Sequence, residues 1–130
     1  MIYTNLMKQP SQPKALVSLF QIPEDYRAQL EKIAASPEQS IPHTSINSCI
    51  IQALEDYLDL PQGVQPKPNV PKVPLRAYTI RTNIVLKQKV THCAASWQLK
   101  TSLPISMNAV VNTAILAFLQ KKIPSYQPPF

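Results

Sequence analysis

The sequence contains a single glycine among its 130 residues, and it has no long run of apolar residues. One glycine excludes a glycine-rich phosphate loop, and neither H-E-x-x-H nor G-x-S-x-G occurs. No apolar run reaches the roughly 18–20 residues of a membrane span, and the first residues lack a signal peptide's apolar core. We therefore expect a cytoplasmic protein that is neither an enzyme nor a membrane protein.

Cysteine and histidine are also scarce, with two of each. Cys49 and Cys93 stand inside apolar helical patterns, which is typical of buried packing residues. Together with His43 and His92 they show none of the usual zinc-ligand spacings. We expect no metal site and no cofactor.

Acidic residues are missing from the whole second half. Residues 1–60 hold four basic and all seven acidic residues, a net charge of −3, whereas residues 61–130 hold nine basic residues and no acidic one. The total net charge is +6. A half without any carboxylate has a strongly positive field, which favours a polyanionic partner over a merely soluble basic surface.

Proline is abundant, with fourteen residues, and most of them fall in three stretches. These stretches predict a flexible arm over 1–14, an extended linker over 59–74 and a tail over 120–130, because proline interrupts helices and strands. The two segments between them, unit 1 (15–58) and unit 2 (75–119), are expected to fold.

The two units share an internal repeat. Residues 45–58 read SINSCIIQALEDYL and residues 106–119 read SMNAVVNTAILAFL, an offset of 61. Such a period indicates one supersecondary element used twice. The identical pairs are Ser45/Ser106, Asn47/Asn108, Ala53/Ala114 and Leu58/Leu119.

Each unit predicts a strand followed by two helices. Alternating character predicts strands over 17–22 and 77–82. Pro23 suits the first position of the next helix in unit 1, and Asn83 suits the N-cap in unit 2. Loops are expected over 36–44 and 96–105, and Ser45 and Ser106 are expected to cap the second helices, which should be the most buried elements.

One strand per unit leaves backbone groups without partners, unless the other unit supplies a second strand. We therefore predict a mainly α fold with a two-stranded antiparallel ribbon. Four helices would cover one face of the ribbon, and the two units would form one domain.

Unit 1 resembles the ribbon-helix-helix family of DNA-binding proteins, of the MetJ, Arc and CopG type. The resemblance is carried by VSLFQIPEDYRAQLEKIAAS and SINSCIIQALEDYL, most closely at Ile22-Pro23-Glu24 and at the Ala-Leu-Glu-Asp-Tyr of 53–57. It implies a tandem, single-chain version in which two fused copies replace the usual homodimer. Both loops between the helices lack the short glycine-containing turn that is common in the family.

In that family the outer face of the ribbon enters the DNA major groove. Alternation places Phe20, Ile22, Tyr78 and Ile80 on the core face. Arg81 could then pair with guanine and Gln21 with adenine, while Thr79 could bond or make a methyl contact. The expected base-reading set is Val17, Leu19, Gln21, Ala77, Thr79 and Arg81, of which Val17, Leu19 and Ala77 offer only apolar contact.

Phosphate contacts are expected at the starts of the second helices, at Ser45 and Ser106, because free N–H groups and the helix dipole bind anions there. Plain capping without a ligand is the alternative for both serines. Lys100, in the expected loop before Ser106, and Lys72 and Arg76, before the second strand, would add backbone contacts.

These features predict a sequence-specific, double-stranded DNA-binding protein that acts as a transcriptional regulator or repressor. The resemblance also implies that two chains can lie together on DNA as a homodimer. The alternative is a protein-interaction module, antitoxin-like, that has lost base reading. Its partner would be held by the apolar ribbon residues or by the tail, through Tyr126 and Phe130.

Overall fold

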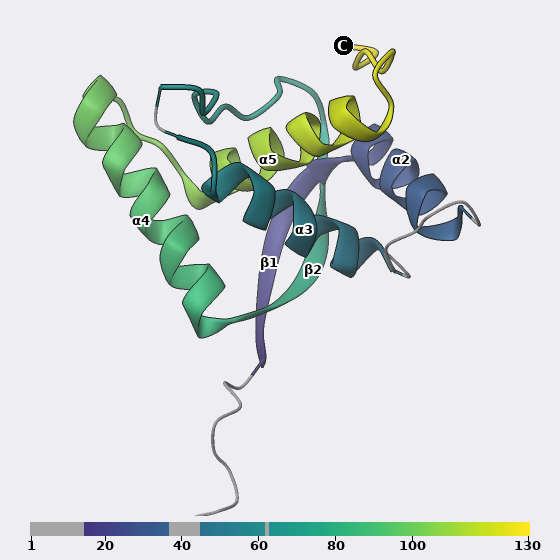
Figure 1. The fold of residues 1–130 in the computed structure, drawn as a ribbon, viewed down its shortest axis with the longest axis horizontal. Coiled ribbons are helices and arrows are strands. Elements are labelled where there is room, and N and C mark those ends of the chain that lie inside the picture. Colours follow the sequence, from purple (N-terminus) through teal and green to yellow (C-terminus); the bar gives the residue numbers. More distant parts are fainter. Residues whose placement is uncertain (1–14, 37–44, 62) are drawn as a thin grey trace, which may run out of the picture.

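The computed structural model describes residues 15–36, 45–61 and 63–130 (Figure 1). The described residues form two strands and four helices, as the sequence predicts. Helices α3 and α5 lie side by side in the middle, with α2 at one end of the molecule and α4 at the other. In chain order the elements are β1 (Ala15–Pro23), α2 (Glu24–Ala35), α3 (Ile46–Leu58), β2 (Leu75–Asn83), α4 (Ile84–Thr101) and α5 (Met107–Lys122).

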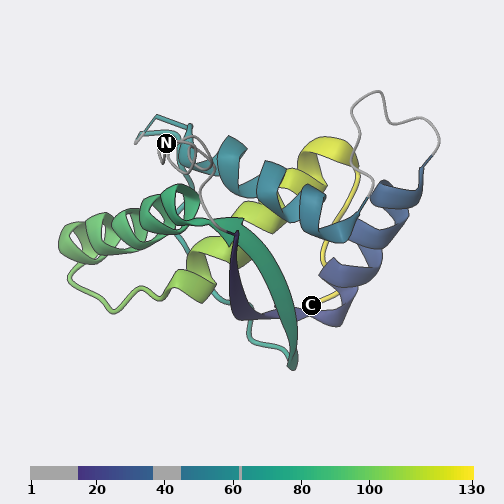
Figure 2. The same ribbon diagram turned by 90° about the horizontal axis from the view of Figure 1, so that it is seen from below.

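Strands β1 and β2 pair antiparallel along their whole length, from Ala15 opposite Asn83 to Pro23 opposite Leu75. The predicted pairing of the two units is therefore confirmed, and each strand is longer than predicted by residues at both ends. Ile22 and Ile80 are buried on one face of the ribbon, as the alternation predicts. That face meets the helices, which lie to one side of the ribbon (Figure 2).

Side-chain caps fix the starts of three helices. The Oγ atoms of Ser45 and Ser106 each accept a 3.0 Å hydrogen bond from the backbone N–H three residues on, and Asn83 Oδ1 accepts one from Leu86. These three predicted caps are confirmed. Pro23 is the N-cap of α2, with extended backbone, and not its first helical residue. It also ends β1, so strand and helix follow each other without a loop.

Helix α4 has 18 residues against 12 in α2. The prediction of a loop over 96–105 is wrong for 96–101, which are helical, and confirmed for 102–105. In unit 1 a proline follows Ser36, whereas unit 2 has Trp97 at the equivalent position and no proline before Pro104. The helix therefore continues, with the Thr101 hydroxyl donating to the Trp97 carbonyl oxygen. It ends at Ser102, which adopts a left-handed conformation with φ of 61°. Residues 37–44, most of the other predicted loop, lie outside the described residues.

The core lies between the second helices of the two units. Ile50 and Leu54 of α3 are buried, as are Val111 and Ile115 at the equivalent positions of α5. Burying such a side chain contributes about 1.5–3 kcal/mol relative to exposure. Cys49 and Cys93 are also buried, as predicted, and neither forms a disulfide.

Each unit contributes its second helix to the other unit's strand. Helix α3 of unit 1 packs against β2, and α5 of unit 2 packs against β1. The two units therefore interlock and do not form separate bodies.

The linker and the tail both pack on the helices. In the linker, Gln65 accepts a 2.7 Å hydrogen bond from the Trp97 indole N–H, and the Asn69 backbone N–H donates to the Thr113 hydroxyl. In the tail, Tyr126 is buried and its hydroxyl donates to Asp25 of α2. The described residues of the linker and of the tail are therefore held against the helices. Over the residues that the structure describes, no helix is both long and apolar enough to span a membrane.

Candidate nucleic-acid interface

The outer face of the ribbon carries all six predicted base-reading residues. The register places Val17 opposite Arg81, Leu19 opposite Thr79 and Gln21 opposite Ala77. All six residues are exposed, and Val17 and Leu19 are 65% and 66% exposed. The alternation of strand residues therefore brings together on one surface the residues that the sequence singled out. A test of their function needs DNA.

This surface has a long polar side chain at each end and smaller or apolar side chains between them. Arg81 lies beside Val17 at one end, and Gln21 lies beside Ala77 at the other. The central pair is Leu19 and Thr79. Arg81 is the only charged residue of the six.

An asparagine from the opposite unit holds the backbone at each polar end. Asn47 of α3 donates to the Arg81 carbonyl oxygen over 3.1 Å and accepts from the Arg81 N–H over 2.7 Å. At the other end the Gln21 N–H donates to Asn108 Oδ1 of α5 over 2.9 Å. Asn112 Nδ2 completes this arrangement with a 2.9 Å bond to the Gln21 carbonyl oxygen.

These bonds satisfy backbone groups that face away from the partner strand, where a two-stranded ribbon offers no ladder partner. Sequence reasoning found no role for Asn47, Asn108 and Asn112. The signal was present for two of them, because Asn47 and Asn108 are one of the identical pairs of the repeat. What the repeat could not show is that each asparagine bonds to the other unit's strand.

The same asparagines place the starts of α3 and α5 beside the ribbon. Asn47 is two residues after the cap Ser45, and Asn108 is two residues after the cap Ser106. The start of α3 therefore lies next to Arg81, and the start of α5 lies next to Gln21. Both serines are exposed, and the first turns, INSC and MNAV, contain no carboxylate that would compete with an anion.

The predicted basic contacts do not gather at this surface. Lys100 belongs to the last turn of α4 and not to a loop, and its Nζ lies 4.7 Å from the centre of the Trp97 ring. Lys72 is an exposed linker residue that lines a cleft with Phe130 of the tail. Arg76 is exposed as the second residue of β2, not before the strand as predicted, and forms an ion pair with a carboxylate of unit 1.

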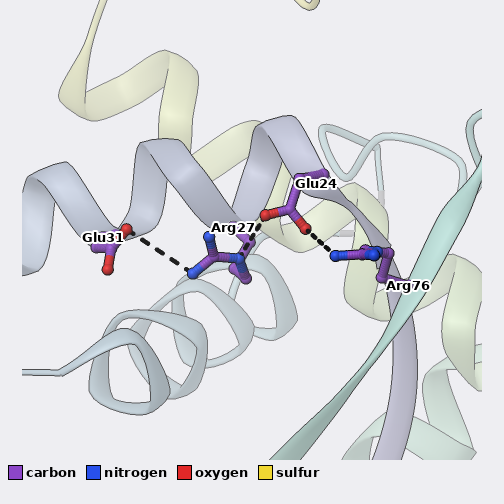
Figure 3. A network of polar contacts seen from close by, with 4 residues as sticks. All are labelled: Glu24, Arg27, Glu31 and Arg76. Atoms are coloured by element: carbon purple, nitrogen blue, oxygen red, sulfur yellow. Dashed lines mark hydrogen bonds and ion pairs between the residues drawn. The ribbon is translucent and has the colours of Figure 1, made fainter.

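Figure 3 shows that carboxylate, Glu24, between two arginines. It accepts a 2.8 Å hydrogen bond from Arg27 and lies 3.7 Å from Arg76. The hydrogen bond from Arg27, with the charge of Arg76 beside it, holds the pKa of Glu24 below its usual range. Arg76 is therefore partly neutralised before any phosphate approaches.

A further cleft is lined by residues of the helices and the linker. This cleft, of about 580 Å³, lies between the end of α3, the linker and α4, lined among others by Leu58, Val85 and Trp97. Burial raises the pKa of the Cys93 thiol at its edge, which disfavours the reactive thiolate. Among the described residues, no group of three or more His, Cys, Asp or Glu side chains could hold a metal ion, and His43 lies outside them.

Comparisons of the chain with protein-family models, with curated proteins and with solved structures found no match.

Proposed function

We propose that the chain is a sequence-specific, double-stranded DNA-binding protein, a transcriptional regulator that inserts its ribbon into the major groove. In this proposal the chain is a tandem ribbon-helix-helix protein whose two units act as a single-chain pseudo-dimer. The interlocking of each second helix with the other unit's strand supports that arrangement. The major groove, about 12 Å wide, admits a two-stranded ribbon.

One observation carries the proposal, namely the exposed ribbon face with a helix start at each end. A side chain able to pair with base edges, Arg81 or Gln21, stands at each end beside an exposed serine cap. Side chains in the groove would read bases, while the helix starts would bind the flanking phosphates and fix the register of the protein. The net charge of +6 supports a polyanionic partner.

Fluorescence anisotropy with labelled mixed-sequence duplexes at two salt concentrations tests the proposal. We expect affinity to fall by about one log unit per log unit of salt for each phosphate contacted. Arg81→Ala should weaken binding to a selected site by about 5- to 150-fold, the loss of one bidentate base contact. Lys32→Ala, which removes an exposed cation from the last turn of α2, should change affinity less than twofold.

A second candidate function, a protein-interaction module, is favoured by one observation. Val17 and Leu19 expose two-thirds of their surface in a region where polar readers are expected. The affinity for a protein partner would fall in Leu19→Ala and would change little with salt concentration. The tail is a poorer surface for such a partner, because Tyr126 is buried and Phe130 packs on Tyr26 of α2. If the intact protein did not bind DNA even at low salt, the DNA-binding proposal would be rejected and the protein-interaction module would remain.

A further inference from the structure

We infer that the two ends of the ribbon read different bases, guanine at Arg81 and adenine at Gln21, so that the DNA target is not palindromic. This inference rests on the proposed function. It depends on three features of the ribbon, namely the equivalence of the two positions, their chemistry and the way their backbones are held.

Gln21 and Arg81 occupy the same place in the two units. They are 60 residues apart, as are Leu19 and Thr79, which pair with each other at the centre of the outer face. A quasi-twofold axis through this central pair exchanges β1 with β2 and therefore exchanges Gln21 with Arg81. On DNA, the two side chains would meet equivalent positions of the two half-sites.

The two side chains demand different base edges. The guanidinium of Arg81 has donors only, so it requires two acceptors, and guanine offers O6 and N7 in the major groove. The amide of Gln21 has a donor and an acceptor, which match N7 and the N6 amino group of adenine. An arginine in place of Gln21 could not accept a bond from the adenine amino group.

At both positions the backbone N–H and C=O groups are held by asparagine side chains. Asn47 holds both backbone groups of Arg81, and the pair Asn108 and Asn112 hold those of Gln21. Asn112 Nδ2 also donates to the Asn108 carbonyl oxygen over 2.9 Å, which orients its amide. Bidentate base contacts need a fixed side-chain origin, and these bonds supply it at both ends.

The register also sets the spacing of the two contacts. The two ends are four positions apart along each strand, so the Cα atoms of Gln21 and Arg81 lie about 14 Å apart across the ribbon. At about 3.4 Å per base pair along the helix axis, this span corresponds to about four base pairs. The inferred target therefore has a guanine and an adenine at equivalent half-site positions that are this far apart.

Selection from a random duplex library tests this inference with the full-length protein, Gln21→Arg and Arg81→Gln. The wild type should select a non-palindromic site. Gln21→Arg should select guanine at this position in both half-sites, and Arg81→Gln should select adenine at this position in both. The positions that face Val17, Leu19, Ala77 and Thr79 should stay as the wild type selects them. In the wild-type site, the adenine that faces Gln21 can be exchanged for guanine. Affinity should then fall about 5- to 150-fold for the wild type and rise by a similar factor for Gln21→Arg.

The outcomes separate the inference from the proposed function. A palindromic site selected by the wild type, or an unchanged site selected by Gln21→Arg, overturns the inference while DNA binding stands. Failure of the wild type to enrich any sequence overturns both. Thermal unfolding followed by circular dichroism checks that the variants are folded. We expect no change, because Gln21 is exposed and its contacts to Asn108 and Asn112 are made by the backbone.

Discussion

The two ends of the molecule differ more than a repeat would suggest. At one end α2 has 12 residues and is covered by the tail, where the Phe130 ring lies 5.9 Å from the Tyr26 ring. At the other end α4 has 18 residues and is held by the linker through Gln65. The last turn of α4 carries Leu99, which is 86% exposed.

The middle of the molecule, by contrast, keeps the repeat. Leu54 of α3 and Ile115 of α5 are equivalent and are 1% and 0% exposed, and Asn47 and Asn108 each bond to the other unit's strand. Where the two units share a core, every change of volume affects both, because protein interiors are close-packed. The difference between middle and ends therefore shows which parts of the repeat are constrained by contact between the units.

The largest expected effect is on the shared core. Leu54→Ala and Ile115→Ala should each lower the free energy of unfolding by about 2–5 kcal/mol, because each leaves a cavity between α3 and α5. Leu99→Ala on the exposed end of α4 should change it by less than about 0.5 kcal/mol. Urea unfolding followed by circular dichroism measures all three. Two separate transitions in either core variant would contradict a core shared by both units.

At the α2 end we expect an alkaline transition. Burial, with the charge of Asp25 adding to it, raises the pKa of Tyr26 to about 12, while the unfolded chain titrates near 10. Below pH 10 the phenol is neutral in the folded and the unfolded chain, and the stability of the folded state is unaffected. As the pH rises from 10 to 12 the phenol ionises in the unfolded chain first, so about 3 kcal/mol of stability is lost. Unfolding free energies measured from pH 8 to 11 should therefore fall less steeply for Tyr26→Phe than for wild type. If the unfolding free energies of the two proteins fell equally steeply with pH, ionisation of Tyr26 would not be the cause of the alkaline loss of stability.

The asparagine contacts sharpen the comparison within the middle. Asn47→Ala removes both side-chain bonds to Arg81, so we expect a loss of about 2 kcal/mol in unfolding free energy. Asn108→Ala removes one bond to Gln21 and leaves the bond from Asn112, so we expect about 1 kcal/mol. Thermal unfolding of both variants shows which of the two substitutions costs more stability. An equal loss in both would mean that the bond from Asn112 does not hold Gln21 once Asn108 is removed.

Much of this arrangement follows from short-range pattern. The exposed face of the ribbon was predictable because the period of a strand is two and Ile22 and Ile80 fix which face is buried. The caps at Ser45 and Ser106 were predictable because a cap depends on residues three positions away.

What the sequence could not provide are contacts between distant residues. The bonds of Asn47 to Arg81 and of Asn112 to Gln21 join residues 34 and 91 positions apart. The docking of Tyr126 on Asp25 spans 101 positions. The extra length of α4 was predictable only in part. The absence of a proline at 97 permits the longer helix, but the sequence does not show that Trp97 bonds to Gln65 in the linker. Pattern therefore predicts elements and faces, whereas partners come from the packing of the units.

The smallest expected effect concerns the ion pairs at the start of α2. Glu24→Gln removes the carboxylate that lies 3.7 Å from Arg76, so that this cation becomes fully available to a phosphate. If the ribbon binds DNA, affinity at low salt should rise by about twofold and the salt slope should steepen by up to about one. The matched control is Glu31→Gln, because it makes the same charge change on the same helix and Glu31 pairs with Arg27. Equal gains in both variants would assign the effect to net charge. A gain confined to Glu24→Gln that disappears in Glu24→Gln/Arg76→Ala, but persists in Glu24→Gln/Arg27→Ala, would place Arg76 at the edge of the DNA interface.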